Sequence, residues 1–199
     1  SCPTGYVRNA SGTCVKDDPD KPCEGNPVKN PRIAPQTNSG VDGGRFGPNR
    51  KNNDGSAKDH KGLDIANDAG DSIFSMYDGK VVRMNKNKEH KDLGWYVTVQ
   101  SKVDGKWHVI TFAHLQKDDR PSNGSSINAG NLIGKQGTSG NLADAIKKGL
   151  AEPHTHIIAR KRIGSEWTLK NDYGEKMDPE KVLTTKFDEQ GNPVSGTDC

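Results

Sequence analysis

The sequence contains few hydrophobic and few aromatic residues. Of its 199 residues, 30% are hydrophobic and 6% are aromatic, and the mean hydropathy is −0.91. Values this low are typical of disordered chains or of domains with a thin core. The 23 glycines and 11 prolines, however, cluster between distinct apolar runs. We therefore interpret the chain as a loop-rich, largely β domain.

Long apolar runs and long basic runs are both missing. No stretch approaches the length of a membrane span, and no signal peptide is recognisable. The net charge is only +3, without an arm rich in Lys and Arg, so we expect neither a nucleic-acid partner nor a membrane span. These features favour the mature form of an exported protein, which would be secreted, periplasmic or attached to the cell surface.

Cysteine is missing from residues 24–198, and no CxxC pair occurs anywhere. This argues against a zinc site built from cysteines. The four cysteines, Cys2, Cys14, Cys23 and Cys199, lie at the two ends of the chain, as expected for two disulfides formed in an oxidising compartment. Three pairings can be drawn, and we favour Cys2–Cys14 with Cys23–Cys199.

The pattern of strands and turns predicts three segments. Residues 1–39 form a Cys-bounded appendage and linker, residues 40–185 the main domain, and residues 186–199 a tail tethered through Cys199. Within the domain we predict one hairpin over 72–84 around Asp78-Gly79, a second over 95–112, short strands at 131–134 and 154–160, and a helix over 142–150. The rest is charged and mostly loop. The fold class is thus mainly β (α+β), with a small antiparallel sheet and one short helix.

Histidines and one aspartate form a pattern that points to a metal site. His60 lies four residues before Asp64, and His114 follows an apolar strand. His154 and His156 are two apart in a strand, so both rings lie on the same face. Two imidazoles and a carboxylate are a typical catalytic zinc set, and additional histidines can accept a proton or stabilise an oxyanion.

Several segments, in the right order, resemble the lysostaphin/LytM-type zinc endopeptidases, the twenty-third metallopeptidase family. His60-Lys61-Gly62-Leu63-Asp64 matches the HxxxD motif of that family, and His154-Thr155-His156 matches its HxH motif. The other matching segments are Gly44-Arg45-Phe46-Gly47, Ala69-Gly70, Asp78-Gly79-Lys80-Val81-Val82, Phe112-Ala113-His114-Leu115 and the glycine-rich turn at 134–140. The similarity extends over residues 40–160.

The resemblance implies a function and a role for each residue of the motifs. His60, Asp64 and His156 would bind Zn²⁺, while His114 and His154 would be unliganded catalytic histidines. The fold would be a small antiparallel β-sheet with the site in a groove, and the substrate would be the peptide part of peptidoglycan, in its stems or cross-bridges. We expect a monomer. His90 and His108 match nothing in the family pattern and are interpreted as surface residues.

The sequence also departs from the family pattern. Phe112 replaces the usual tyrosine, and Thr155 stands where an apolar residue is usual. Insertions at 141–153 and 116–128 would alter the groove walls and so the substrate preference. An asparagine within 24–39 could block the metal, as upstream segments do in latent members of the family. Two alternative functions remain: a zinc peptidase acting on a protein substrate, and a non-catalytic wall-binding or regulatory domain.

Overall fold

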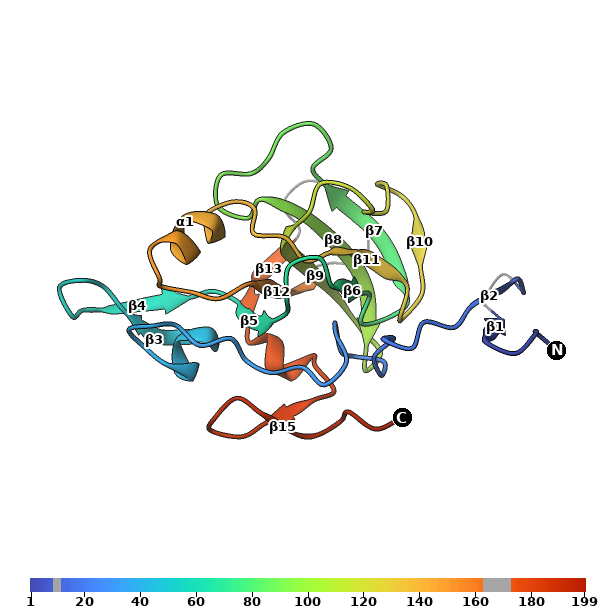
Figure 1. Cartoon of the computed structure of the whole chain (residues 1–199), viewed down its shortest axis with the longest axis horizontal. Helices are drawn as coiled ribbons and strands as arrows, with labels where there is room; N and C mark the ends of the chain where they lie inside the picture. Colours follow the sequence, from blue (N-terminus) through green and yellow to red (C-terminus); the bar gives the residue numbers. More distant parts are fainter. Residues whose placement is uncertain (9–11, 163–172) are drawn as a thin grey trace.

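The computed structural model describes residues 1–8, 12–162 and 173–199, and most of its regular structure is antiparallel strand (Figure 1). Its first elements are β1 (Tyr6–Arg8), β2 (Cys14–Lys16), η1 (Val41–Gly44), β3 (Gly47–Lys51), β4 (Ala57–His60), β5 (Leu63–Ala66), β6 (Ser72–Phe74), β7 (Gly79–Met84) and β8 (Trp95–Val103). They are followed by β9 (Lys106–Leu115), β10 (Ser126–Ile127), β11 (Leu132–Lys135), α1 (Leu142–Lys147), β12 (His154–Arg162), β13 (Tyr173–Met177), η2 (Pro179–Lys181), β14 (Lys186–Phe187) and β15 (Pro193–Ser195).

A seven-stranded antiparallel sheet forms the centre of the molecule. Its order is β10-β7-β8-β9-β12-β13, and β5 pairs with the first half of β12. β12 therefore has β9 on one side and β5 followed by β13 on the other. This architecture, with one short helix, confirms the predicted fold class.

One face of the central sheet packs on the hydrophobic core. Because side chains alternate along a strand, β8, β9 and β12 each place every second residue on this face, as Val97, Val99, Ile110, Phe112 and Ile157 do. Ile73 of β6 and Ile133 of β11 belong to the same cluster. The other face carries polar and charged side chains and is available for a site.

The structure confirms one of the two predicted hairpins and contradicts the other. β8 and β9 pair over 95–115 around Asp104-Gly105, both with positive φ, as predicted for the second hairpin. The hairpin predicted over 72–84 is wrong, because β6 pairs with β11 whereas β7 pairs with β8. Gly79 is required for another reason: a Cβ there would lie 2.1 Å from the carbonyl oxygen of Gln100 on the neighbouring strand.

Two other expectations need correction. The helix ends at Lys147 rather than at 150, because Gly149 adopts a positive φ of 69° and the amide of Leu150 bonds back to the carbonyl of Ala145. The region after 160, expected to be mostly loop, contains β13, β14 and β15. Among the described residues, no helix is long and apolar enough to cross a membrane.

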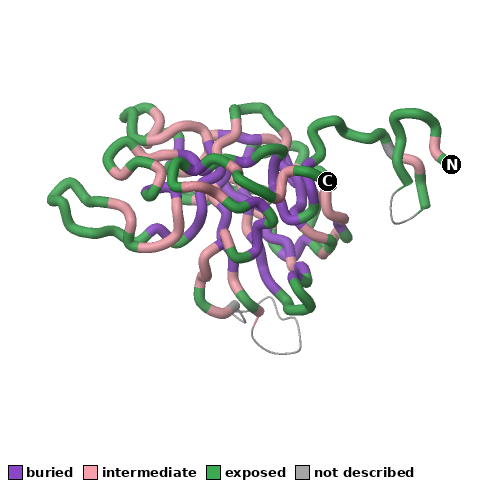
Figure 2. Tube along the Cα trace, turned by 90° about the horizontal axis from the view of Figure 1, so that it is seen from below, coloured by how far each residue is buried: buried purple, intermediate pink, exposed green. Residues whose placement is uncertain are grey.

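Two disulfides connect the cysteines in the favoured pairing, Cys2–Cys14 and Cys23–Cys199. The first closes the β1–β2 appendage, which stands away from the body and is largely exposed (Figure 2). The second joins segments 176 residues apart in the sequence. Asn26 supports the same junction, because its side chain bonds to the carbonyl of Gly196 and to the amide of Thr185.

We predict that the two disulfides contribute unequally to stability. Replacing both cysteines by serine in Cys23–Cys199 should lower the free energy of unfolding by about 2–5 kcal/mol, because the unfolded chain regains the freedom of a long loop. The matched variant Cys2→Ser/Cys14→Ser should change it by less than about 0.5 kcal/mol, since the exposed appendage buries little of the domain. Urea denaturation measures both values, and equal losses would contradict this prediction.

Candidate functional site

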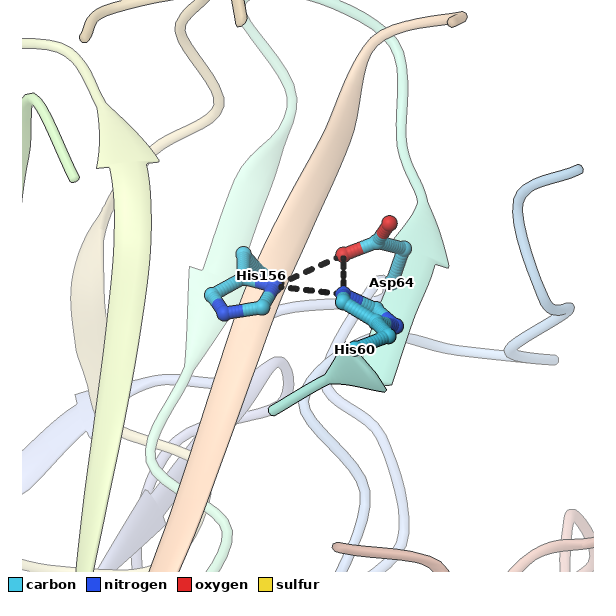
Figure 3. A group of neighbouring side chains, drawn as sticks. All are labelled: His60, Asp64 and His156. Carbon is cyan, nitrogen blue, oxygen red and sulfur yellow. Dashed lines mark hydrogen bonds and ion pairs between the residues drawn. The ribbon is translucent and has the colours of Figure 1, made fainter. Parts of the chain in front are cut away.

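The site is built on the pairing of β5 with β12. Asp64 and His156 are directly opposite each other in this antiparallel ladder, so their side chains lie side by side on the polar face. Leu63 and Ile65 point the other way, into the core. The two halves of the predicted motifs, 92 residues apart in sequence, meet with His156 Nδ1 2.8 Å from Asp64 Oδ1 (Figure 3).

His60 reaches the same point from the end of β4. A short turn at Lys61-Gly62 brings the chain back into β5, and His60 Nε2 lies 3.2 Å from His156 Nδ1 (Figure 3). Gly62 is essential to this turn. A Cβ at that position would lie 2.4 Å from His156 Cε1 and 2.6 Å from the carbonyl oxygen of Ile157. The glycine of the His-x-Gly-x-Asp segment therefore lets His60 approach β12 closely.

The three converging atoms can hold a metal ion. His60 Nε2, Asp64 Oδ1 and His156 Nδ1 are separated by 3.2, 3.3 and 2.8 Å, and all three lie within 4.8 Å of one another. Tetrahedral zinc, with ligand bonds of about 2.0–2.1 Å, requires ligand atoms about 3.3 Å apart. The donor set and its spacing therefore fit zinc. The separation of 2.8 Å between Asp64 Oδ1 and His156 Nδ1 is somewhat shorter than this value.

Three imidazoles are oriented by backbone carbonyls. Nδ1 of His60 bonds to the carbonyl of Arg45 at 2.9 Å, that of His114 to Ser139 at 2.9 Å, and that of His154 to Glu152 at 2.8 Å. A carbonyl oxygen only accepts, so each Nδ1 carries a proton, and in the neutral ring each Nε2 has a free lone pair. Nε2 of His60 faces Nδ1 of His156, and Nε2 of His154 lies 3.4 Å from Asp64 Oδ1.

His114 is brought to the site by an unusual backbone conformation. Phe112 belongs to the core and Ala113 is opposite His156, so simple alternation would turn His114 towards the core. His114 instead has a φ of 62° and lines the site cavity, with its ring centroid 5.4 Å from that of His154. Such a φ is disfavoured for a residue with a Cβ, and strain of this kind is typical of functional sites.

A buried glutamine connects the strands that carry the two additional histidines. The side-chain amide of Gln136 donates to the carbonyl of His154 at 2.7 Å and to that of Gly137 at 2.8 Å, and it lies 3.4 Å from the carbonyl of His114. Its oxygen accepts from the hydroxyl of Thr155 at 2.5 Å. This bond explains why a polar residue between His154 and His156 is tolerated in a fully buried position.

The carboxylate of Asp64 is fully buried, and each of its oxygens has a different environment. Oδ1 faces the histidines, whereas Oδ2 accepts from Arg50 Nη2 at 2.5 Å. Burial alone would raise the pKa of Asp64, but the imidazoles of His154, His156 and His60 outweigh this effect and hold it well below its usual value. Asp64 is therefore anionic at neutral pH, as a metal ligand must be.

Arg50, at the β3–β4 hairpin, was not suggested by the sequence. Its Nη2 also lies 3.0 Å from His60 Nε2, and its Nε donates to the carbonyl of Gly43 at 2.7 Å. The guanidinium thus balances the charge of Asp64 from the outer side while Oδ1 stays directed at the ligand group. Arginines are abundant on surfaces, and no local pattern around Arg50 distinguishes it.

Burial lowers the pKa of two of the imidazoles, His114 and His156. The pKa of His114 falls to about 3, first because the ring is buried and then because His154 and His156 are near. Burial also lowers the pKa of His156, although Asp64 opposes this shift. His114 is therefore neutral at physiological pH, and its Nε2 lone pair is free to accept a hydrogen bond.

Asp64, His114, His154 and His156 line a cavity of about 530 Å³. β3–β4 contributes Arg50 and Lys58 to its wall, and the insert at 141–153 contributes Leu142 and Leu150. Asn38 also lines it, whereas Asn26 is buried at the Thr185 junction.

The structure corrects one interpretation outside the site. His108, interpreted as a surface residue, is buried, and its Nδ1 bonds to the carbonyl of Lys106. His90 is exposed, and its ring lies edge-on to Tyr96. Neither residue lies in the metal-ligating group.

Comparison with known families agrees with the site geometry. Residues 58–179, more than half of the chain, match the model of peptidase family M23. The chain therefore belongs to peptidase family M23. Among curated proteins, none matches the chain in sequence.

Solved structures share the fold at low sequence identity. A zinc-containing peptidase from Vibrio cholerae matches with a TM-score of 0.54 and 20% identity, over 87% of this chain and 45% of that one. Csd3 from Helicobacter pylori matches with 0.51 and 20%, over 91% and 41%. The catalytic domain of the antimicrobial peptidase lysostaphin from Staphylococcus simulans gives 0.49 and 21%, over 70% and 88%. The chain thus spans less than half the length of the first two structures.

The backbone at His114 generates a stability prediction. His114→Gly should be more stable than His114→Ala by about 1 kcal/mol, because alanine retains the penalty of a positive φ and glycine does not. Ala113→Gly is the matched control: it should lower stability by about 0.5–1 kcal/mol, since residue 113 has an ordinary strand conformation. Urea denaturation of these variants checks the prediction, which requires opposite preferences at the two neighbouring positions.

Proposed function

We propose that the chain is a zinc-dependent endopeptidase that hydrolyses peptide bonds in the stems or cross-bridges of peptidoglycan. The observation that supports this most directly is the convergence of His60, Asp64 and His156 beside two further histidines whose rings are oriented by backbone carbonyls. In this proposal the metal is held by His60 Nε2, Asp64 Oδ1 and His156 Nδ1. Zinc in such a site polarises the scissile carbonyl and acidifies water.

His114 and His154 would perform the proton transfers. His114 Nε2 lies in the cavity with its lone pair free, so it can take the proton of the attacking water. His154 lies against both His114 and Asp64, where a protonated ring would stabilise negative charge on the former carbonyl oxygen. One of the two imidazoles then returns a proton to the leaving amine.

The backbone carbonyls that bind His114 and His154 support this assignment, because they hold both rings in place before the reaction. Each ring is restrained at Nδ1, so no tautomer change or ring flip is needed before the reaction. Asp64 would remain anionic throughout, because Arg50 neutralises its outer oxygen. The chain's own residues thus orient water and substrate without rearranging.

The choice of peptidoglycan as substrate is supported by the family and by the expected export of the chain. Two disulfides are consistent with an oxidising, extracytoplasmic location. We therefore place the protein outside the cytoplasm, acting as a monomer on wall peptides. A zinc peptidase with a protein substrate, and a non-catalytic wall-binding domain, are the alternatives that the experiments below separate.

The ligand assignment predicts how metal content responds to substitution. The wild type should carry about one zinc per chain, and His60→Ala and Asp64→Ala should each lose it, because two ligands hold zinc poorly. His114→Ala is the matched control: it removes an imidazole from the same cavity but should keep the zinc. Elemental analysis by mass spectrometry measures this directly, and zinc retained by both ligand variants would refute the assignment.

The reaction predicts the release of new amino termini from purified peptidoglycan. The wild type should release them, His60→Ala should not, and His114→Ala should lose about 10²–10⁴-fold in rate because a general base is missing. Labelling of free amines, followed by identification of the labelled residue, measures the rate and identifies the bond.

Failure of this assay would distinguish the alternatives. Zinc-loaded protein that releases no amine from several wall types but cleaves a denatured protein would favour a protein substrate. Binding to the wall without cleavage of either would favour a non-catalytic domain. An unchanged rate for His114→Ala would remove that residue from the mechanism.

A further inference from the structure

A second cavity lies on the polar face of the central sheet, beside the site. It has a volume of about 660 Å³ and shares Asp92 and Leu93 with the site cavity, so the two adjoin. We call it the sheet-face groove, and define it by Arg83, Thr98, Thr111, Ile158, Arg160 and Lys176. Asp92 is the single acidic side chain among its described lining residues.

Strand register places this groove in line with the metal-ligating residues. His156, Ile158 and Arg160 alternate along β12 and therefore share one face. Arg83, Thr98, Thr111 and Ile158 follow one another across four neighbouring strands, and the hydroxyls of Thr98 and Thr111 bond at 2.8 Å. Arg160 is four residues from His156, which corresponds to about 13 Å along a strand.

Positive charge dominates the described lining of the groove. Arg160 and Lys176 are directly opposite each other on β12 and β13, an arrangement of like charges that lowers sheet stability. Lys176 has a lowered pKa, first because it is partly buried and then because Arg160 and Lys61 are near. Within residues 1–8, 12–162 and 173–199, no carboxylate forms an ion pair with Arg83, Arg160 or Lys176.

We propose that the sheet-face groove binds a free carboxylate of the substrate peptide, about four extended residues from the scissile bond, through Arg160 and Lys176. This inference rests on the proposed endopeptidase function and makes an acidic peptide the preferred substrate. Arginine and lysine are the side chains that bind carboxylates most strongly. The floor of Val109, Thr111 and Ile158, of which Val109 and Ile158 are buried, suits a peptide rather than a highly charged polymer.

The groove also explains the position of Arg83. It extends from the β7 side, four strands away from Lys176, so the two cationic walls lie on opposite sides of the floor. An acidic peptide crossing the floor would be attracted from both sides. The carboxylate itself is assigned to Arg160 and Lys176, because these two cations are adjacent.

The test compares two forms of one substrate. Soluble cross-linked peptidoglycan fragments are used with their carboxylates free or converted to amides by carbodiimide and ammonia. The wild type should show a KM about five-fold lower for the free acid, with similar kcat, because this is the most that a partly exposed ion pair contributes. In Arg160→Gln/Lys176→Gln this difference should shrink to less than about two-fold.

Lys161→Gln is the matched control. Lys161 adjoins Arg160 on the same strand, is exposed, and points to the opposite face. It removes the same charge from β12 and should keep the wild-type preference for the free acid. Thermal unfolding of each variant verifies that the domain is folded before KM is measured.

The outcomes separate this inference from the proposed function. A wild type that cleaves both forms with equal KM overturns the carboxylate site and leaves the peptidase function intact. An equal loss on both forms in the double variant also overturns it, since a structural role alone would have that effect. Inhibition by phosphate-rich wall polymer without discrimination between the two peptides would assign the cations to a polyanion instead. Cleavage of neither form rejects the endopeptidase function, and this inference with it.

Discussion

The contact between Asp64 and His156 is the interaction around which the rest of the site is arranged. A carboxylate with no exposed surface is costly to bury unless charges and hydrogen bonds surround it. Arg50 and the imidazoles of His60, His154 and His156 supply those partners. Their convergence brings four strands to one carboxylate: β3, the end of β4, β5 and β12. The same convergence creates a pocket whose donor atoms match the spacing of zinc ligands.

The pairing of β5 with β12 depends in turn on small and buried residues. Gly62 lets the β4–β5 turn pack against His156, and Gln136 bonds to the backbone carbonyl of His154 and to the hydroxyl of Thr155. Neither residue donates an atom to the metal-ligating group. Their contribution is positional, because an error of about 1 Å in a ligand or base is enough to reduce a catalytic rate strongly.

The structure brings together the residues that the sequence singled out for the site, whereas it contradicts one of the predicted strand pairings. His60, Asp64 and the two histidines of 154–156 were found because their spacing reflects local geometry: a short turn, and alternation along a strand. The hairpin over 72–84 failed because Asp78-Gly79 has the composition of a turn, whereas Gly79 is needed for close approach to Gln100. Arg50, Gly62 and Gln136 act only through contacts between distant segments. No local pattern could assign their roles before the fold was known.

The strained backbone of His114 and the like charges of Arg160 and Lys176 lie on the same face of the sheet. Both can be explained in the same way. His114 keeps a disfavoured φ, and Arg160 is held opposite Lys176, although neither arrangement helps the domain to fold. A core built for stability alone would avoid both. The opposite face of the same strands is formed mainly by packed aliphatic residues and Phe112. Because the two faces share one backbone, the well-packed face stabilises the conformation in which the polar face is held. The thin hydrophobic core is thus sufficient to stabilise a sheet whose unfavourable features, a disfavoured φ and adjacent like charges, lie on the face where a substrate would bind.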